Sequence, residues 1–142
     1  KDSRIGTNGT VVLILYFITK ITIISEIITI NPKYLIIFPI VARLSTSVNA
    51  GLSDYARKSG MSNAIISENG IFEVIFSLIL TNALVFLIIG TKGGIALFIA
   101  LLFIILFMFN VRKKIGGITG DTMGASLELT SILVLFLGII LR

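Results

Sequence analysis

The part of the sequence with the clearest capacity for chemistry is a basic, glycine-rich segment at residues 113–122. Its glycines let backbone N–H groups approach an anion closely, and its lysine pair adds positive charge. A helix that begins near Thr122 would also direct its N-terminal N–H groups at the segment. The lysines precede the glycines, so this is not the phosphate-binding loop of nucleoside triphosphatases. The predicted phosphate-binding residues are Lys113, Lys114, Gly116, Gly117, Thr119, Gly120 and Thr122.

The alternative for this segment is a plain loop in which Asp121 or Thr122 caps the next helix. Two carboxylates nearby raise a related question. Asp121 and Glu128 are seven residues apart, with Ala125 between them at helical spacing, so all three share one helix face. Glu128 lies inside an apolar stretch, where a carboxylate is costly and either faces a polar interior or pairs with a cation. The structural alternative is a salt bridge from Glu128 to Arg43 or to Lys20.

Two further polar segments precede apolar stretches. Residues 54–60 form a short basic loop that contains Tyr55, Arg57 and Lys58, and such loops often simply lie at lipid headgroups. Residues 1–9 combine Asp2 and Arg4 with another lysine, two glycines and hydroxyl groups. That segment is either an amphipathic lead-in to a membrane helix or part of a site.

Composition excludes several kinds of chemistry. The 142 residues include no cysteine and no histidine, so a disulfide framework, a thiolate metal site and a histidine-activated nucleophile are all excluded within this chain. A metal here would be a hard cation held by oxygen ligands. The net charge is +5, but the basic residues lie between apolar runs, so we expect no nucleic-acid partner.

The elements that must position these residues are membrane helices. Hydrophobic residues make up 56% of the chain and charged residues 13%, with a mean hydropathy of +1.07. Apolar stretches at residues 9–30, 34–50, 71–89, 93–110 and 122–141 are each near the roughly 20 residues that cross a bilayer as a helix. The sequence therefore predicts an all-α, polytopic helical bundle in a lipid bilayer, with one transmembrane domain over residues 1–142.

Lysine and arginine distribution predicts the orientation of that bundle. Five crossings place residues 1–8, 51–70 and 111–121 on one side of the membrane. That side carries seven basic residues, and the other carries three, so the first side is expected to be cytoplasmic. The seven are Lys1, Arg4, Arg57, Lys58, Arg112, Lys113 and Lys114; the three are Lys33, Lys92 and Arg142.

Three segments together resemble the cobalamin synthase family, in the right order and over nearly the whole chain. Residues 1–9 resemble the family's "[KR]DSR[IL]GT.G" block, which also runs into a membrane helix with a lysine at the position of Lys20. Residues 54–61 resemble its "YAR..GLG" loop, which follows a helix with an arginine at the position of Arg43. Residues 116–128 resemble its "GG.TGDTLGA..E" block, the most specific of the three.

This resemblance implies adenosylcobinamide-GDP ribazoletransferase activity in the inner membrane, with Mg²⁺ as cofactor. A hydroxyl of α-ribazole, or of its 5′-phosphate, would attack the phosphate attached to the corrinoid and release GMP. Asp2 and Asp121 would orient that hydroxyl or complete the magnesium shell. The diphosphate would be bound by Arg4, Arg57, Lys58 and Lys113 or Lys114, and Arg43 and Glu128 would line the inner wall of the cavity.

The chain departs from the family in one respect. An acidic stretch resembling "DGLADTADG" lies upstream of the first block in the family and is its expected main magnesium site. We therefore expect this chain, which starts at Lys1, to be the C-terminal portion of a longer protein, with its N-terminal segment as a partner, and to be inactive alone. The alternatives are a membrane phosphotransferase of the CDP-alcohol type, whose "DG..AR" pattern is not found here, or a small membrane transporter component.

Overall fold

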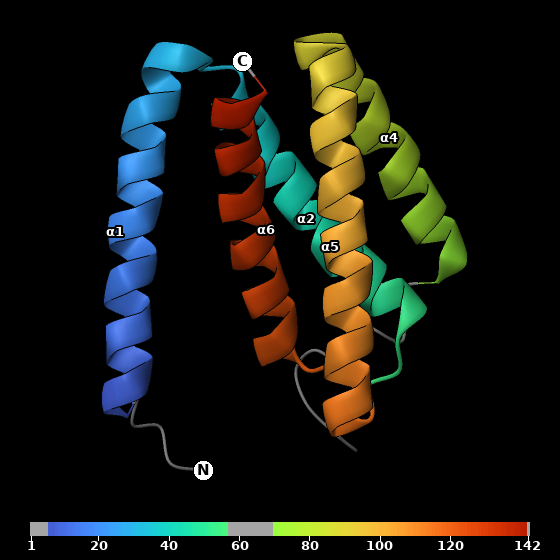
Figure 1. Ribbon diagram of the computed structural model, residues 1–142. Helices are drawn as coiled ribbons and strands as arrows, with labels where there is room; N and C mark the ends of the chain where they lie inside the picture. The colour runs from blue at the N-terminus through green and yellow to red at the C-terminus, as the bar shows by residue number, and fades with distance from the viewer. Residues whose placement is uncertain (1–5, 57–69, 142) are drawn as a thin grey trace.

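Five long antiparallel helices make up the part of the chain that the computed structural model describes, residues 6–56 and 70–141 (Figure 1). All five are long and apolar enough to cross a membrane, which confirms the predicted all-α, multi-pass bundle. In chain order they are α1 (Thr7–Ile30), α2 (Tyr34–Leu52), α4 (Ile71–Ile89), α5 (Thr91–Ile115) and α6 (Gly120–Ile140).

The alternating directions of the helices gather three connections at one end of the bundle. The start of α1, the end of α2 and the α5–α6 connection all lie at the lower end in Figure 1. The α1–α2 and α4–α5 turns and the end of α6 lie at the opposite end. The described residues of the three polar segments, 6–9, 54–56 and 113–122, therefore lie at the same end, as five crossings predict. We call it the motif end.

The centre of the bundle is the contact between α2 and α6, the most extensive pairing of helices. Both helices bury small or hydroxyl-bearing residues, among them Ala42 and Ser45 of α2 and Ser126 and Gly138 of α6, which are typical of closely packed membrane helices. Asn49 on α2 is buried, and its Nδ2 donates to the Ser126 hydroxyl of α6 at 2.9 Å and to the Ser45 carbonyl at 2.7 Å. Hydrogen bonds of this kind hold membrane helices together where lipid supplies no hydrophobic driving force between them.

The remaining helices surround this pair and expose apolar side chains outward. Phe72 and Leu87 on α4 and Phe98 on α5 are 70–81% exposed, as expected for surfaces that face lipid. α4 contacts α2 partly through a hydrogen bond of 3.0 Å between the hydroxyls of Ser77 and Ser47. α1 lies at the edge of the bundle, where only Ile23 and Ile27 of its side chains are buried.

The predicted limits of α5 were too narrow, whereas α6 begins two residues before its predicted start and ends one residue before its predicted end. α5 extends over Thr91–Ile115, whereas apolar composition predicted residues 93–110. At its start, Gly90 has a φ of 81°, which turns the chain within one residue, so Gly93 and Gly94 are helical. At its end, three basic residues form the last turn, where the helix dipole favours positive charge.

Gly138 offers a test of this packing. A Cβ atom there would lie 2.6 Å from Cγ of Tyr34 and 2.8 Å from Cδ1 of Ile27, at the meeting point of α1, α2 and α6. Gly138→Val is expected to destabilise the protein by about 1–3 kcal/mol, because the new side chain must displace a buried ring. Thermal unfolding of the detergent-solubilised protein measures this. Gly94→Val, at a position where a Cβ meets nothing within 4 Å, is the matched control. Equal stability of both variants would contradict the packing.

Candidate functional site

Two loops that are far apart in sequence are joined at the motif end by backbone hydrogen bonds. The N–H of Ile118 donates to the carbonyl of Asp54, and the N–H of Ala56 donates to the carbonyl of Ile118, each at 2.9 Å. Tyr55 and Ile118 thereby form a short parallel β-bridge. The bridge connects the start of the 54–60 segment to the glycine loop, residues 116–119. Two of the three predicted motif segments therefore meet.

The glycines of the loop have different structural roles. Gly116 ends α5 in the left-handed conformation, with a φ of 78°, and its N–H donates to the Arg112 carbonyl at 2.9 Å. Gly117 lies against the neighbouring backbone, where a Cβ would be 2.4 Å from the Asp54 carbonyl oxygen. Only glycine permits that approach, so Gly117 is a requirement of the β-bridge itself.

The start of α6 differs from the prediction. The helix begins at Gly120, and Thr119, not Asp121 or Thr122, is its N-cap. The Thr119 hydroxyl accepts from the N–H of Thr122 at 3.3 Å, and the Thr122 hydroxyl accepts from the N–H of Thr119 at 2.8 Å. Both threonines, predicted as substrate-binding residues, thus hold the helix start together.

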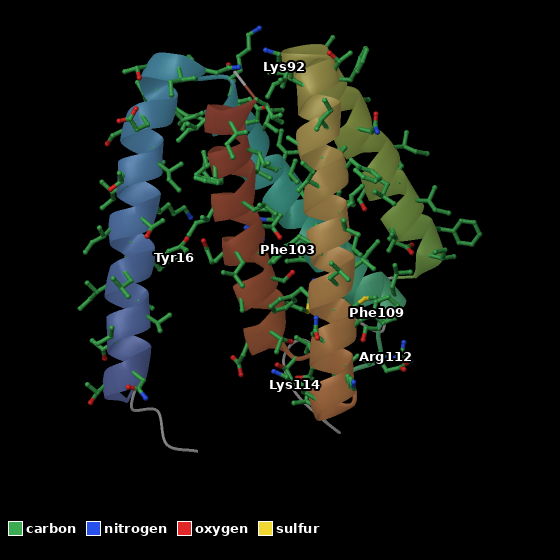
Figure 2. All side chains as sticks on the ribbon, viewed as in Figure 1. Tyr16, Lys92, Phe103, Phe109, Arg112 and Lys114 are labelled. Carbon is green, nitrogen blue, oxygen red and sulfur yellow. The ribbon has the colours of Figure 1, made fainter. Side chains whose placement is uncertain are left out.

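The predicted lysines belong to the last turn of α5 and not to the loop. Arg112, Lys113 and Lys114 are exposed there, and Figure 2 shows Arg112 and Lys114 at the motif end. Nη2 of Arg112 lies 3.5 Å from Oδ2 of Asp54, which adds a weak, solvent-exposed ion pair to the β-bridge. Asp121 is exposed in the first turn of α6, directly after the loop. Positive charge, the N-terminus of α6 and one carboxylate therefore adjoin the same loop.

Glu128 lies two helical turns beyond Asp121 and pairs with Lys20. The distance between Lys20 Nζ and Glu128 Oε2 is 2.8 Å, and the Tyr16 hydroxyl donates to the same oxygen. Lys20 also donates to the Tyr16 hydroxyl at 2.6 Å. Of the two cations proposed from the sequence as partners of Glu128, the structure thus places Lys20 there. Tyr16 faces this cluster from α1 in Figure 2.

Arg43 lies elsewhere. It is exposed at the middle of α2, in a groove of about 440 Å³ that α4 completes with Ser77 and Thr81. Glu128 lines a different pocket, between α1 and α6. The two residues expected to line one cavity therefore border separate hollows, on either side of the bundle.

Four predicted site residues, Asp2, Arg4, Arg57 and Lys58, lie outside the described residues. Within residues 6–56 and 70–141 there is no cluster of three acidic side chains able to hold a metal ion. Magnesium usually keeps several waters and takes one or two carboxylates together with substrate phosphates, and of the two predicted carboxylate ligands only Asp121 is among the described residues. The described residues therefore do not fit a complete magnesium site.

Sequence reasoning did not select Tyr16 or the Arg112–Asp54 pair as parts of the site. The signal for Tyr16 is present, since Tyr16 and Lys20 are four residues apart and share one helix face. The partnership of Arg112 with Asp54 joins residues 58 positions apart, and nothing local in the sequence indicates it.

The fold and the site define a multi-pass helical membrane protein with a basic, glycine-rich loop cluster at one end. Its sequence matches the family model described as cobalamin-5-phosphate synthase over residues 1–139. The chain belongs to this family, as the resemblance of its three segments indicated.

Individual relatives agree. The chain is 34% identical to an adenosylcobinamide-GDP ribazoletransferase of Fusobacterium nucleatum, covering 99% of this chain and 59% of the relative. It is 36% identical to one of Clostridium acetobutylicum, covering 91% of this chain and 52% of the relative. The chain thus spans between half and three-fifths of the length of these relatives. No solved structure matches it.

The β-bridge can be tested with Gly117→Ala. The added methyl group collides with the Asp54 carbonyl, so we expect the two loops to separate and the activity of the full-length protein to fall by about two orders of magnitude, as happens when groups are misplaced by an ångström. Turnover and thermal stability are measured together. Gly94→Ala, where a Cβ meets nothing within 4 Å and which lies outside the three motif segments, serves as the control. Full activity of Gly117→Ala would show that the bridge is dispensable.

Proposed function

We propose that the protein containing this chain is an adenosylcobinamide-GDP ribazoletransferase. It joins adenosylcobinamide-GDP to α-ribazole, or to α-ribazole 5′-phosphate, and releases GMP. The observation that carries the proposal is the β-bridge between Tyr55 and Ile118, which Gly117 permits. It brings the 54–56 backbone, the glycine loop and the first turn of α6 together beside the basic end of α5. The family match favours this function over a CDP-alcohol transferase or a transporter component.

The reaction needs positioning and charge neutralisation more than covalent catalysis. The nucleoside hydroxyl forms a new bond to the phosphorus on the corrinoid side of the pyrophosphate. The bond from that phosphorus to the bridging oxygen breaks, and GMP leaves with this oxygen. Asp121 accepts the proton of the hydroxyl in our proposal, because it is the exposed carboxylate that directly follows the glycine loop.

The negative charge on the departing GMP needs cationic partners. Lys113 and Lys114 at the end of α5 are exposed and adjoin the glycine loop, which suits them to the diphosphate. N–H groups at the start of α6 add partial positive charge. Arg4, Arg57 and Lys58 are assigned the same role from the family resemblance, and Asp2 is assigned a role beside Asp121.

Magnesium dependence is part of the proposal, and it rests on the family resemblance. The described residues supply at most part of its shell, so we assign no step to the metal. The remaining ligands would come from the longer protein. We further propose that the protein lies in the inner membrane with its motif end in the cytoplasm, because that end carries the excess of basic residues.

Loss of the Asp121 carboxylate tests the mechanism. Asp121→Asn in the full-length protein is expected to reduce release of GMP from adenosylcobinamide-GDP by at least about 100-fold, the usual contribution of a positioned general base. Glu26→Gln, the same replacement of a carboxylate by an amide at an exposed residue of α1, is expected to keep normal turnover. Near-normal rates for Asp121→Asn would refute its role, and no GMP release by the wild type would refute the function.

The proposed orientation predicts that the Ile115 end of α5 faces the cytoplasm and that the Thr91 end faces the opposite side of the membrane. The chain has no cysteine, so single cysteines can be placed at exposed Ile115, at the motif end, and at exposed Thr91, at the other end. In a full-length protein cleared of other cysteines, a membrane-impermeant maleimide should label Thr91→Cys in intact spheroplasts. Ile115→Cys should be labelled only after the membrane is opened. The reverse pattern would invert the orientation.

A further inference from the structure

A pocket between α1 and α6 has no assigned role in the reaction so far. Its volume is about 590 Å³, within the range of small-molecule sites. Gly9 lies at one end of its lining, close to the start of α1 at the motif end, and Lys20 lies eleven residues further along the helix. That interval corresponds to about 16 Å of helix, so the pocket extends from the motif end into the membrane.

The walls of the pocket are apolar and its inner end is charged. Val12, Leu13 and Phe17 of α1 face Ala125 and Leu129 of α6. The inner end is the cluster of Tyr16, Lys20 and Glu128, whose described hydrogen bonds all reach Glu128 through Oε2. The Glu128 side chain is 46% exposed, so its carboxylate remains accessible to a polar group from the pocket. A hydrocarbon tail would give this charged end nothing to bind, whereas an apolar ring with a polar edge complements both parts.

The pocket also lies in register with the proposed reaction site. Asp121, Ala125 and Glu128 lie on one face of α6. The pocket wall at Ala125 therefore begins about 6 Å, or one helical turn, beyond Asp121, the proposed proton acceptor. In a nucleoside the base and the hydroxyls are attached to the same small ribose ring. A nucleoside whose reacting hydroxyl lies at Asp121 can therefore place its base against Ala125.

From this juxtaposition we infer that the α1–α6 pocket holds the flat, apolar aromatic base of the nucleoside substrate. Ala125 sets how large a base fits, and the Tyr16–Lys20–Glu128 cluster binds the polar edge of the nucleoside. Phe17 and Tyr16, whose ring centroids are 5.3 Å apart, provide the aromatic contact on α1. The inference rests on the proposed function and adds a substrate subsite and a specificity-determining residue to it.

Narrowing the pocket tests the inference. In the full-length protein, Ala125→Leu is expected to raise the KM for α-ribazole roughly tenfold or more, because the extra carbons occupy space that the base needs. The KM for adenosylcobinamide-GDP should change less than about twofold, since that substrate lies outside the pocket. The KM for a ribonucleoside of unmethylated benzimidazole, whose base is smaller, should rise less. Ala83→Leu, the same change on the exposed surface of α4, is the matched control and should alter neither KM.

Opening the pocket gives a second test that does not depend on how the protein tolerates a larger residue. Leu13→Ala shortens a half-exposed side chain of the α1 wall and should improve turnover of nucleosides with bases larger than that of α-ribazole. Unchanged selectivity in both Leu13→Ala and Ala125→Leu, with normal wild-type turnover, would overturn the pocket assignment and leave the proposed function standing. An equal rise of both KM values in Ala125→Leu would also overturn it. A wild type that releases no GMP would instead refute the proposed function, and this inference with it.

Discussion

The arrangement of the motif end depends on two backbone hydrogen bonds to one residue, Ile118. Its N–H and carbonyl engage the backbone of residues 54–56, and Gly117 makes room for them because it has no side chain. Irregular backbone near a membrane is tolerated where its polar groups find partners in the protein. The β-bridge supplies such partners for backbone groups of Asp54, Ala56 and Ile118. It also fixes the end of α2 relative to the α5–α6 connection.

The β-bridge determines where the ends of α5 and α6 lie, and these helix ends form the proposed site. The last turn of α5 contains three basic residues, and the helix ends at Ile115, with Gly116 as its C-cap. α6 starts four residues after Gly116, with its N–H groups facing the glycine loop. Two helix ends of opposite dipole thus meet, with the cations compensating the C-terminal one. Such fixed charges need little reorganisation when a pyrophosphate binds, which is the property that phosphate transfer requires of a protein.

Much of this fold could be predicted from composition. Lipid requires helices of a given length, so the spans and the end at which each loop lies followed from apolar runs and their number. Helix limits were less accurate where polar residues continue a helix, as at Lys113 and Lys114, because apolar composition does not detect them. Thr119 was not predicted as the N-cap, since several hydroxyl and acidic residues nearby could serve equally well.

The contacts between helices could not be predicted from the sequence, for a different reason. Spacing along α6 showed that Glu128 shares a face with Asp121, but not which neighbouring helix that face meets. The sequence therefore could not decide whether Lys20 or Arg43 pairs with Glu128. The helix packing decides it, because α1 brings Lys20 to α6, whereas Arg43 lies in the groove between α2 and α4. The β-bridge was equally inaccessible, because it joins residues 63 positions apart, Tyr55 and Ile118, through backbone atoms.

Cross-linking across the β-bridge tests the central claim most directly. Paired residues of neighbouring strands are about 5 Å apart, within reach of a disulfide. The double variant Tyr55→Cys, Ile118→Cys should form an intramolecular cross-link rapidly under mild oxidation in native membranes. Tyr55→Cys combined with Lys92→Cys, at the opposite end of the bundle in Figure 2, should form none. Failure of the first pair to cross-link, or equal cross-linking of both pairs, would contradict the joining of the two loops.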